Sequence, residues 1–253
     1  MMHAIAFSQS QDAAGVLSFQ AGVPDPTVRV SGNDIYVPNG VNKLIGALGC
    51  AGATATQLQL LSPSLRRTQP YDIRPVQLAL VPTGAEPIYL HEDSPIQLDY
   101  NEALNAKISS DPAAAEQAST VVFLTDSVPQ KVTGAIVKTR FQITGAVTAG
   151  QWVNMAITFP DLLPVGVWSC IGAMLVASGV VAARWFPIGQ AWRPGFPVHQ
   201  TLGDRQDFKF RNGFLGKWFD FDQTQPPTID VLASATAGSA TYTGVMDLVK
   251  AGS

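Results

Sequence analysis

The sequence predicts an all-β chain that is built from two consecutive β-sandwiches, and three observations support this fold class. Short segments with alternating, β-branched or aromatic residues recur along the chain. Clusters of turn-forming residues separate these segments at intervals of roughly 8–12 residues, which is the spacing of a sandwich or barrel. One sequence phrase occurs twice, half a chain apart. The 253 residues include 18 Pro and 22 Gly, which favours many short elements over long helices.

The repeated phrase reads Pro-x-Gly-Val-x-x-x-Ile-Gly-Ala. Its copies lie in 37–50 (VPNGVNKLIGALGC) and 163–176 (LPVGVWSCIGAMLV). Pro38 corresponds to Pro164, and each later match keeps this offset of 126 residues. Further matches pair Ala51 with Ala177, Arg67 with Arg193 and, at an offset of 122, Phe19-Gln20 with Phe141-Gln142. A self-match at half the chain length indicates an internal duplication.

The strand-like segments can be located in chain order. They are 28–37, 56–61, 76–80, 96–100, 119–124, 140–144, 152–159, 208–221 and 228–235. A short helix is predicted at 111–118, because Asp111 can cap it and Pro112 suits its first position. Each half then holds about eight strands in about 125 residues, the size of one jelly roll. The polar stretch Ser127–Gly134 sets the predicted boundary, which gives one sandwich in 1–130 and a second in 131–253.

The segment 162–183 has 22 residues without a charge, enough to cross a bilayer as a helix. Its counterpart in the first half contains Lys43 and Asn42, and repeated units should share one structure. We therefore predict two buried strands here and no membrane span. The N-terminal MMHAIAFSQSQDAAG lacks the features of a signal peptide, so we expect synthesis in a cytoplasm.

The composition favours a protein with much covered surface. Apolar residues make up 46% and charged residues 14%, against a usual charged share of about 25%. This suits a subunit of an assembly, although a large core would give a similar composition. The net charge of −3 provides no general attraction to nucleic acid or anionic lipid. Cys50 and Cys170 are interpreted as small buried residues.

No metal site, cofactor site or catalytic constellation is predicted. His3, His91 and His199 are isolated from one another, whereas the metal of a two-domain cupin needs clustered ligands. His91 is interpreted as a solvated loop residue. Asp220 and Asp222 could act as the paired carboxylates of a hydrolase, but an edge strand with a charged outer face explains them better.

Two further kinds of surface fit parts of the sequence. The basic residues from Arg205 to Lys217 alternate with aromatic ones, as in a surface that stacks on nucleic acid, but the pattern also fits an ordinary strand, which we prefer. A β-sandwich that binds carbohydrate or a receptor would need exposed aromatic platforms, for which Trp152 and Trp218 are the candidates.

The second half resembles the second jelly roll of a viral coat-protein family, the double jelly-roll major capsid proteins of tailless icosahedral phages. It is most similar to the short type in lipid-containing single-stranded DNA phages of the Finnish-lake-phage group. The resemblance covers 151–222. It rests on Leu163-Pro164, Gly172-Ala173, Ala182-Ala183-Arg184, Arg193-Pro194-Gly195 and Phe210-Arg211-Asn212-Gly213.

This resemblance implies a structural protein of the virion, without enzymatic activity or cofactor. Such chains form homotrimers whose six sandwiches make a pseudo-hexagonal tile, and the tiles contact neighbouring trimers and minor virion proteins in an icosahedral shell. Many relatives carry an amphipathic or basic terminal arm. Here MMHAIAFSQSQ is short and uncharged, so contact with an internal membrane would be modest at most.

Candidate contacts between subunits are Trp192, Arg193 and Phe196, in the loop-like AWRPGFP. An equally weighted alternative is that Trp192 and Phe196 pack within their own chain. A carbohydrate- or receptor-binding phage protein is the alternative function, and no specific nucleic-acid binding is expected.

Overall fold

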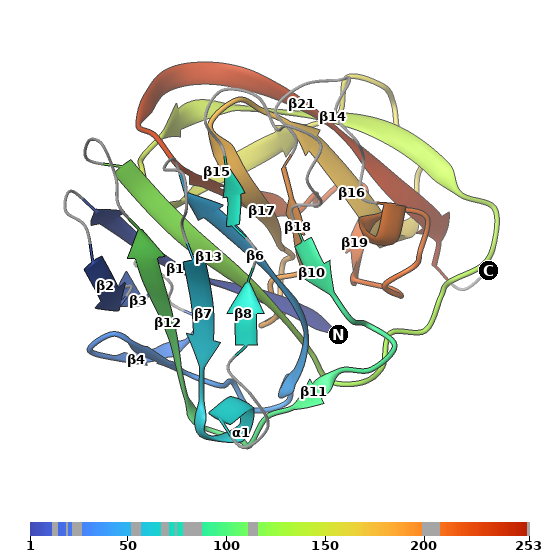
Figure 1. Ribbon diagram of the computed structural model, residues 1–253. Helices are drawn as coiled ribbons and strands as arrows, with labels where there is room; N and C mark the ends of the chain where they lie inside the picture. Colours follow the sequence, from blue (N-terminus) through green and yellow to red (C-terminus); the bar gives the residue numbers. More distant parts are fainter. Residues whose placement is uncertain are drawn as a thin grey trace.

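The computed structural model confirms an all-β chain (Figure 1). It describes residues 1–11, 15–18, 20–21, 27–51, 57–66, 71–73, 75–77, 88–110, 116–198 and 208–251. Within these ranges the helical elements are α1 (Pro63–Arg66) and the 3-10 turn η1 (Phe208–Phe210). Everything else of regular structure is β-strand, so turns and sheets decide the architecture.

Strands of the first half form two sheets. Sheet 1A has the order β1 (Met2–Gln11), β13 (Glu116–Thr125), β6 (Lys43–Ala51) and β10 (Ile88–Leu90), with β3 (Gln20–Ala21), β9 (Pro75–Gln77) and β11 (Ile96–Gln97) at its edges. Sheet 1B has the order β5 (Asp34–Tyr36), β12 (Ala103–Ser110), β7 (Gln57–Leu61) and β8 (Tyr71–Ile73), with β2 (Gly15–Ser18) and β4 (Arg29–Ser31) attached.

Strands of the second half form one eight-stranded sheet that consists of two four-stranded parts. Sheet 2A has the order β14 (Val137–Val147), β21 (Ala237–Lys250), β16 (Val167–Val176) and β19 (Phe219–Asp222). Sheet 2B has the order β15 (Trp152–Thr158), β20 (Thr228–Ala233), β17 (Val180–Phe186) and β18 (Gly195–Pro197). Only two residue pairs join β14 to β15, so the two parts share a narrow seam.

Both halves have the same topology. Strands β1, β5, β6, β7, β8, β11, β12 and β13 occupy, in chain order and in sheet order, the places of β14 to β21. Strand β11 pairs with β6 before its bulge, as β19 pairs with β16. In each half, successive strands mostly alternate between two sheets of four strands each, which is the arrangement of a jelly roll. The fold prediction of two tandem jelly rolls is therefore confirmed. The predicted boundary between 130 and 131 falls in the linker 126–136, which joins β13 to β14.

The repeated phrase marks the same β-bulge in both halves. Along β6, the pairing with β13 skips Ile45, between Leu44 and Gly46. Along β16, the pairing with β21 skips Ile171, at the corresponding place. A bulged residue leaves the ladder and frees its carbonyl group. The Ile45 carbonyl accepts a hydrogen bond from His91 N at 2.8 Å, and the Ile171 carbonyl accepts one from Gly213 N at 3.0 Å.

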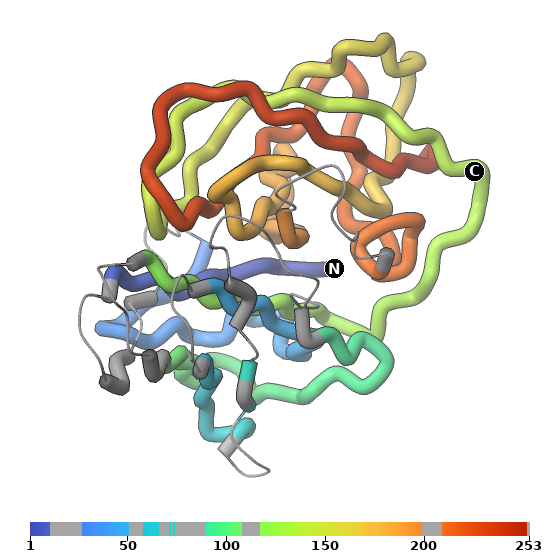
Figure 2. Tube along the Cα trace, turned by 45° about the horizontal axis from the view of Figure 1, so that its top comes forward, coloured from blue at the N-terminus to red at the C-terminus, as the bar shows by residue number. Residues whose placement is uncertain are grey.

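The four sheets are stacked in the order 1B, 1A, 2B, 2A. On β1, Ile5 and Phe7 join the core of the first half, while Ala4 and Ala6 join the core that extends into the second half. Figure 2 shows this strand between the remainder of the first half and the second half. Both inner sheets are covered on two faces, so the halves share a continuous apolar interior.

The uncharged segment 162–183 contains β16 and the start of β17, which confirms the prediction of two buried strands. In the described part of the chain, no helix is long and apolar enough to cross a membrane.

Several local predictions were wrong. Residues 116–118 of the predicted helix lie in β13, and 111–115 lie outside the described residues. The segment 208–221 is not one strand, because Asn212, Gly213 and Gly216 have positive φ and turn the chain before β19. Strands β1 and β21 were not predicted. Phe141-Gln142 lies in β14, the counterpart of β1, whereas Gln20 lies in β3, so their match does not reflect equivalent positions. Phe19 and Arg67 are outside the described residues.

Gly195 permits a close approach between the halves and offers a test of this stacking. A Cβ at Gly195 would lie 2.4 Å from the Cβ of Ala4 and 3.2 Å from the Ala183 carbonyl oxygen. We expect Gly195→Ala to lower the free energy of unfolding by about 1–3 kcal/mol, through overpacking, as measured by urea denaturation. Gly238→Ala is the matched control, since a Cβ there meets nothing within 4 Å. Equal stability of the two variants would contradict the close contact.

Candidate assembly interface

Arg184 on β17 connects the two halves from a fully buried position. Its Nε donates to Asp230 Oδ2 at 2.9 Å, and its Nη1 donates to the carbonyl oxygen of Ala4 on β1 at 3.0 Å. The guanidinium also lies 4.3 Å from the ring centroid of Trp152. A buried charge must be paired and hydrogen-bonded to be tolerated. Here one of the groups that satisfies the guanidinium belongs to the other jelly roll.

Arg193 makes a second connection, in the loop between β17 and β18. Its backbone N donates to His3 Nδ1 at 3.0 Å, and its carbonyl oxygen accepts from Ala4 N at 2.8 Å. Its guanidinium lies 3.4 Å from the ring centroid of Phe186, and Nη1 donates to the Gln190 carbonyl at 2.7 Å. The predicted candidate Arg193 therefore joins β1 to the second half within one chain.

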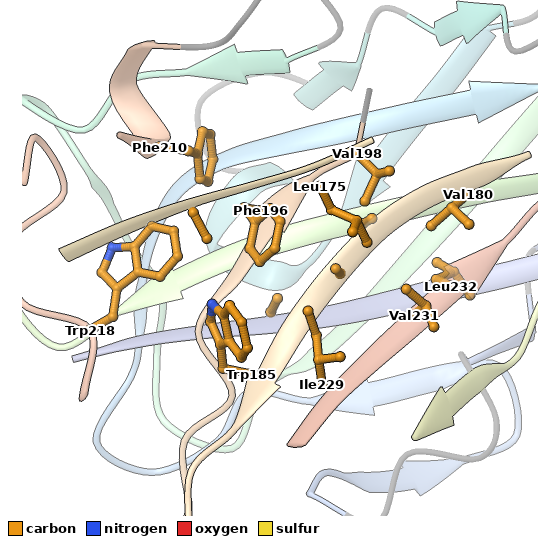
Figure 3. Close-up of a cluster of buried hydrophobic side chains, with 14 of the residues drawn as sticks. Leu175, Val180, Trp185, Phe196, Val198, Phe210, Trp218, Ile229, Val231 and Leu232 are labelled. Atoms are coloured by element: carbon orange, nitrogen blue, oxygen red, sulfur yellow. The ribbon is translucent and has the colours of Figure 1, made fainter. Parts of the chain in front are cut away.

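Trp192 and Phe196 also make contacts within the chain. Trp192 packs against the core of the first half and lies edge-on to His3, with ring centroids 5.6 Å apart. Phe196 is fully buried, 6.0 Å from the ring of Trp185 and 6.0 Å from that of Trp218 (Figure 3). Contact between subunits by Trp192, Arg193 and Phe196 stays a prediction. Phe196 has no exposed surface through which to make it.

The segments that the two bulge carbonyls anchor also meet each other. Glu92 follows His91 in the first half, and Lys209 lies on η1 of the second half. Their side chains form an ion pair of 2.6 Å between Oε1 and Nζ. Nearby, Phe123 of β13 contacts Phe210 at a ring-centroid distance of 5.1 Å. Equivalent features of the duplicated unit thus contribute to the contact between the halves.

Arg211 and Asp247 form a buried ion pair beside the second bulge. The Asp247 carboxylate accepts from Arg211 Nε at 2.6 Å, from Arg211 Nη2 at 2.8 Å and from Asn212 N at 2.9 Å. Burial by itself raises the pKa of Asp247, but these hydrogen bonds and the guanidinium charge more than offset it and hold the pKa below its ordinary value of 3.8. A Cβ at Gly172 would lie 2.8 Å from Arg211 Cα, so Gly172 gives the pair its room.

The carboxylates considered for a hydrolase have structural partners. Asp220 accepts from Ser169 Oγ at 2.5 Å and from Lys217 Nζ at 2.9 Å. Asp222 accepts from the side chain and backbone of Thr224, which lowers its pKa. Strand β19 lies at the end of its sheet, which confirms the interpretation as an edge strand.

Most of the aromatic and basic residues described near β19 are buried or paired, and Phe214, which is exposed, lies under Lys131 with 4.5 Å from Nζ to its ring centroid. Arg211, Phe210 and Trp218 are buried, and Lys209 and Lys217 are in ion pairs. Arg205 lies outside the described residues. The prediction of an exposed aromatic platform for carbohydrate or a receptor is wrong at both candidate tryptophans, because Trp152 and Trp218 are buried in the core.

Of the three histidines, His3 is fully buried, and His199 is outside the described residues. His91 is half-buried rather than solvated. Its Nε2 is hydrogen-bonded to the Tyr71 hydroxyl at 2.8 Å, and burial lowers its pKa. Among the residues that the structure describes, no three His, Cys, Asp or Glu side chains come together as potential metal ligands.

Most of the exposed large apolar side chains lie at one end of the two sandwiches. We call it the linker end, because the linker 126–136 joins the halves there, where β1 and β14 begin and β13 and β21 end. These residues are Met1, Tyr100, Val128, Val137, Leu162, Val165, Val167, Phe186 and Ile188. Exposed apolar side chains that gather in one region indicate a contact surface.

Comparisons with known proteins returned one structural similarity. No family model matches the chain, and no curated protein matches it. The major capsid protein P2 of bacteriophage PM2 is similar to this chain at 10% sequence identity, over 100% of this chain and 99% of that chain, with a TM-score of 0.24. This TM-score is too low to establish a common fold. The assignment of two jelly rolls therefore rests on the strand order of this chain.

The Arg211–Asp247 pair predicts a dependence of stability on pH. Asp247→Asn leaves the buried guanidinium without its charge partner, and we expect a loss of about 3–5 kcal/mol in the free energy of unfolding at pH 7. Because the folded-state pKa is depressed, the contribution of the carboxylate is present above the ordinary value of 3.8 and disappears as the pH falls through the lower, folded-state value.

Urea denaturation between pH 7 and pH 3 measures this effect, and the difference between variant and wild type should shrink at the acid end. Asp161→Asn is the control. It removes an ion pair with Arg140 in which both side chains are exposed, and such pairs contribute little. An Asp247→Asn protein as stable as the control would contradict the assigned role.

Proposed function

We propose that this chain is a capsid subunit of a virion, which assembles as a homotrimer with six jelly rolls in a pseudo-hexagonal arrangement. The observation that carries the proposal is the contact between the two copies of the jelly roll. It joins unlike faces, sheet 1A of the first copy and sheet 2B of the second. A contact between unlike faces is heterologous, and repetition of such a contact produces a closed ring when the rotation permits.

The duplication has a geometric consequence. Each chain uses one A sheet and one B sheet in its internal contact, and its outermost layers are sheet 1B and sheet 2A. These are again one sheet of each kind. Three chains that repeat the contact would place six similar sandwiches in one ring. The low charged fraction of 14% and the apolar side chains of the linker end support burial of further surface in an assembly.

The proposal includes the partners that a shell requires. Neighbouring trimers and other virion proteins would contact the trimer, and the subunit would have no catalytic role. The N-terminal segment, expected to make modest membrane contact at most, is strand β1 of the inner sheet 1A, and residues 2–8 are buried. Any membrane contact would fall to the exposed side chains of the linker end.

The test is the mass of the purified protein in solution, measured by light scattering on a size-exclusion column. We expect three times the 26.9 kDa of one chain, because the proposed ring holds six sandwiches and each chain supplies two of them. Negative-stain electron microscopy of the same fraction should show particles with a hexagonal outline. A stable monomer at micromolar concentration would contradict the proposal.

A further inference from the structure

The loop that carries the second copy of the repeated phrase presents two apolar side chains in a fixed position. Leu163 is buried in the core, and the Pro164 carbonyl accepts a hydrogen bond from Trp168 Nε1 at 2.9 Å. On either side of these anchors, Leu162 is 102% and Val165 is 82% exposed. A loop that is held at its centre and exposes large apolar residues beside it is preorganised for contact with a protein surface.

The loop with the first copy of the phrase is covered in part, and its tip, Asn39 and Gly40, is exposed. Val37 and Val41 are buried, and Gly40 lies against Trp192, with 3.2 Å between the position of an added Cβ and Trp192 Cζ2. Trp192 belongs to the second half and packs against the core of the first. Within one chain, the loop before β6 therefore contacts Trp192 of 187–194, the segment between β17 and β18 of the other jelly roll.

The topology identifies the counterparts of both elements. The loop before β16, 159–166, corresponds to the loop before β6, 37–42. The segment between β7 and β8 corresponds to 187–194, and the structure describes its residues 62–66, which include α1 and the exposed Pro63. The internal contact pairs the loop 37–42 of the first half with the segment 187–194 of the second half. The loop 159–166 of the second half and the segment between β7 and β8 of the first half are the complementary pair that remains.

We propose that the loop 159–166 of one chain docks on segment 62–66 of the first jelly roll of a second copy, in the manner of the internal contact. This inference rests on the proposed function, since it names the surface through which the copies assemble. The occupant is a second copy because the same unit already makes the equivalent contact inside the chain. The contact would bury Leu162 and Val165, and it would bring sheet 2A of one chain next to sheet 1B of the next.

The double variant Leu162→Asp/Val165→Asp tests the proposal. Both side chains are exposed in the single chain, so circular dichroism and the urea midpoint should not change. Two buried charges at the centre of a contact should raise the concentration at which the trimer dissociates at least about a hundredfold, as measured by sedimentation velocity. Ile188→Asp is the matched control. It places a charge at another exposed apolar residue of the linker end, on a segment whose proposed partner is already within the chain, and assembly should be unchanged.

Crosslinking tests the location independently. Two single-cysteine variants, Val165→Cys and Pro63→Cys, are co-expressed and treated with a bis-maleimide reagent. The native Cys50 and Cys170 are buried and should not react in the folded protein. We expect a crosslink between positions 165 and 63 of different chains. Links only between two copies of position 165 would indicate a symmetric contact and would overturn the proposal.

The outcomes separate the inference from the function on which it rests. If the wild type forms trimers and the double variant does so equally well, the docking site is wrong and the capsid proposal stands. If the wild type is a monomer under every condition tested, the proposed function fails and the docking site fails with it. If the double variant and Ile188→Asp weaken assembly to the same degree, the linker end acts as a nonspecific apolar surface, which also overturns the proposed site.

Discussion

Sheet 1A is apolar on both faces, and the arrangement of the whole chain depends on this property. Ile5 and Phe7 face the core of the first sandwich, while Ala4 and Ala6 require cover from outside it. The second jelly roll supplies that cover, and Gly195 lets its backbone approach the small side chains of β1. Burial of apolar area is the main driving force of folding. Either half alone would therefore expose to water the apolar face that the other half covers.

The duplicated bulge is the second constraint. A bulge at Ile45 and again at Ile171 turns one carbonyl out of each ladder, and a backbone N–H from a neighbouring segment satisfies it. The two anchored segments then meet through Lys209 and Glu92. The phrase Ile-Gly-Ala is thus architectural. It places a loop beside each sheet, and these loops contribute to the contact between the halves.

The sequence was sufficient for the duplicated β-sandwich, because period-two segments and turn clusters report strands directly. It was insufficient to predict strands that are covered on both faces and side chains whose burial depends on distant segments. Strand β1 is covered on both faces and does not alternate between apolar and polar residues, so it was missed. Strand β21 contains the buried Asp247, whose partner Arg211 no local pattern identifies. Trp192 and Phe196 looked equally suited to internal and external contacts, since exposure depends on the tertiary arrangement.

The most direct test of the shared interior is hydrogen exchange of the native protein, followed by mass spectrometry of peptides from β1, β13, β17 and β20. If the inner sheets stabilise each other, amides in all four strands should exchange through one common opening with the same free energy, because loss of either sheet uncovers the other. Exchange of β1 and β13 through a distinctly cheaper opening, while β17 and β20 stay protected, would show two independent sandwiches and contradict this account.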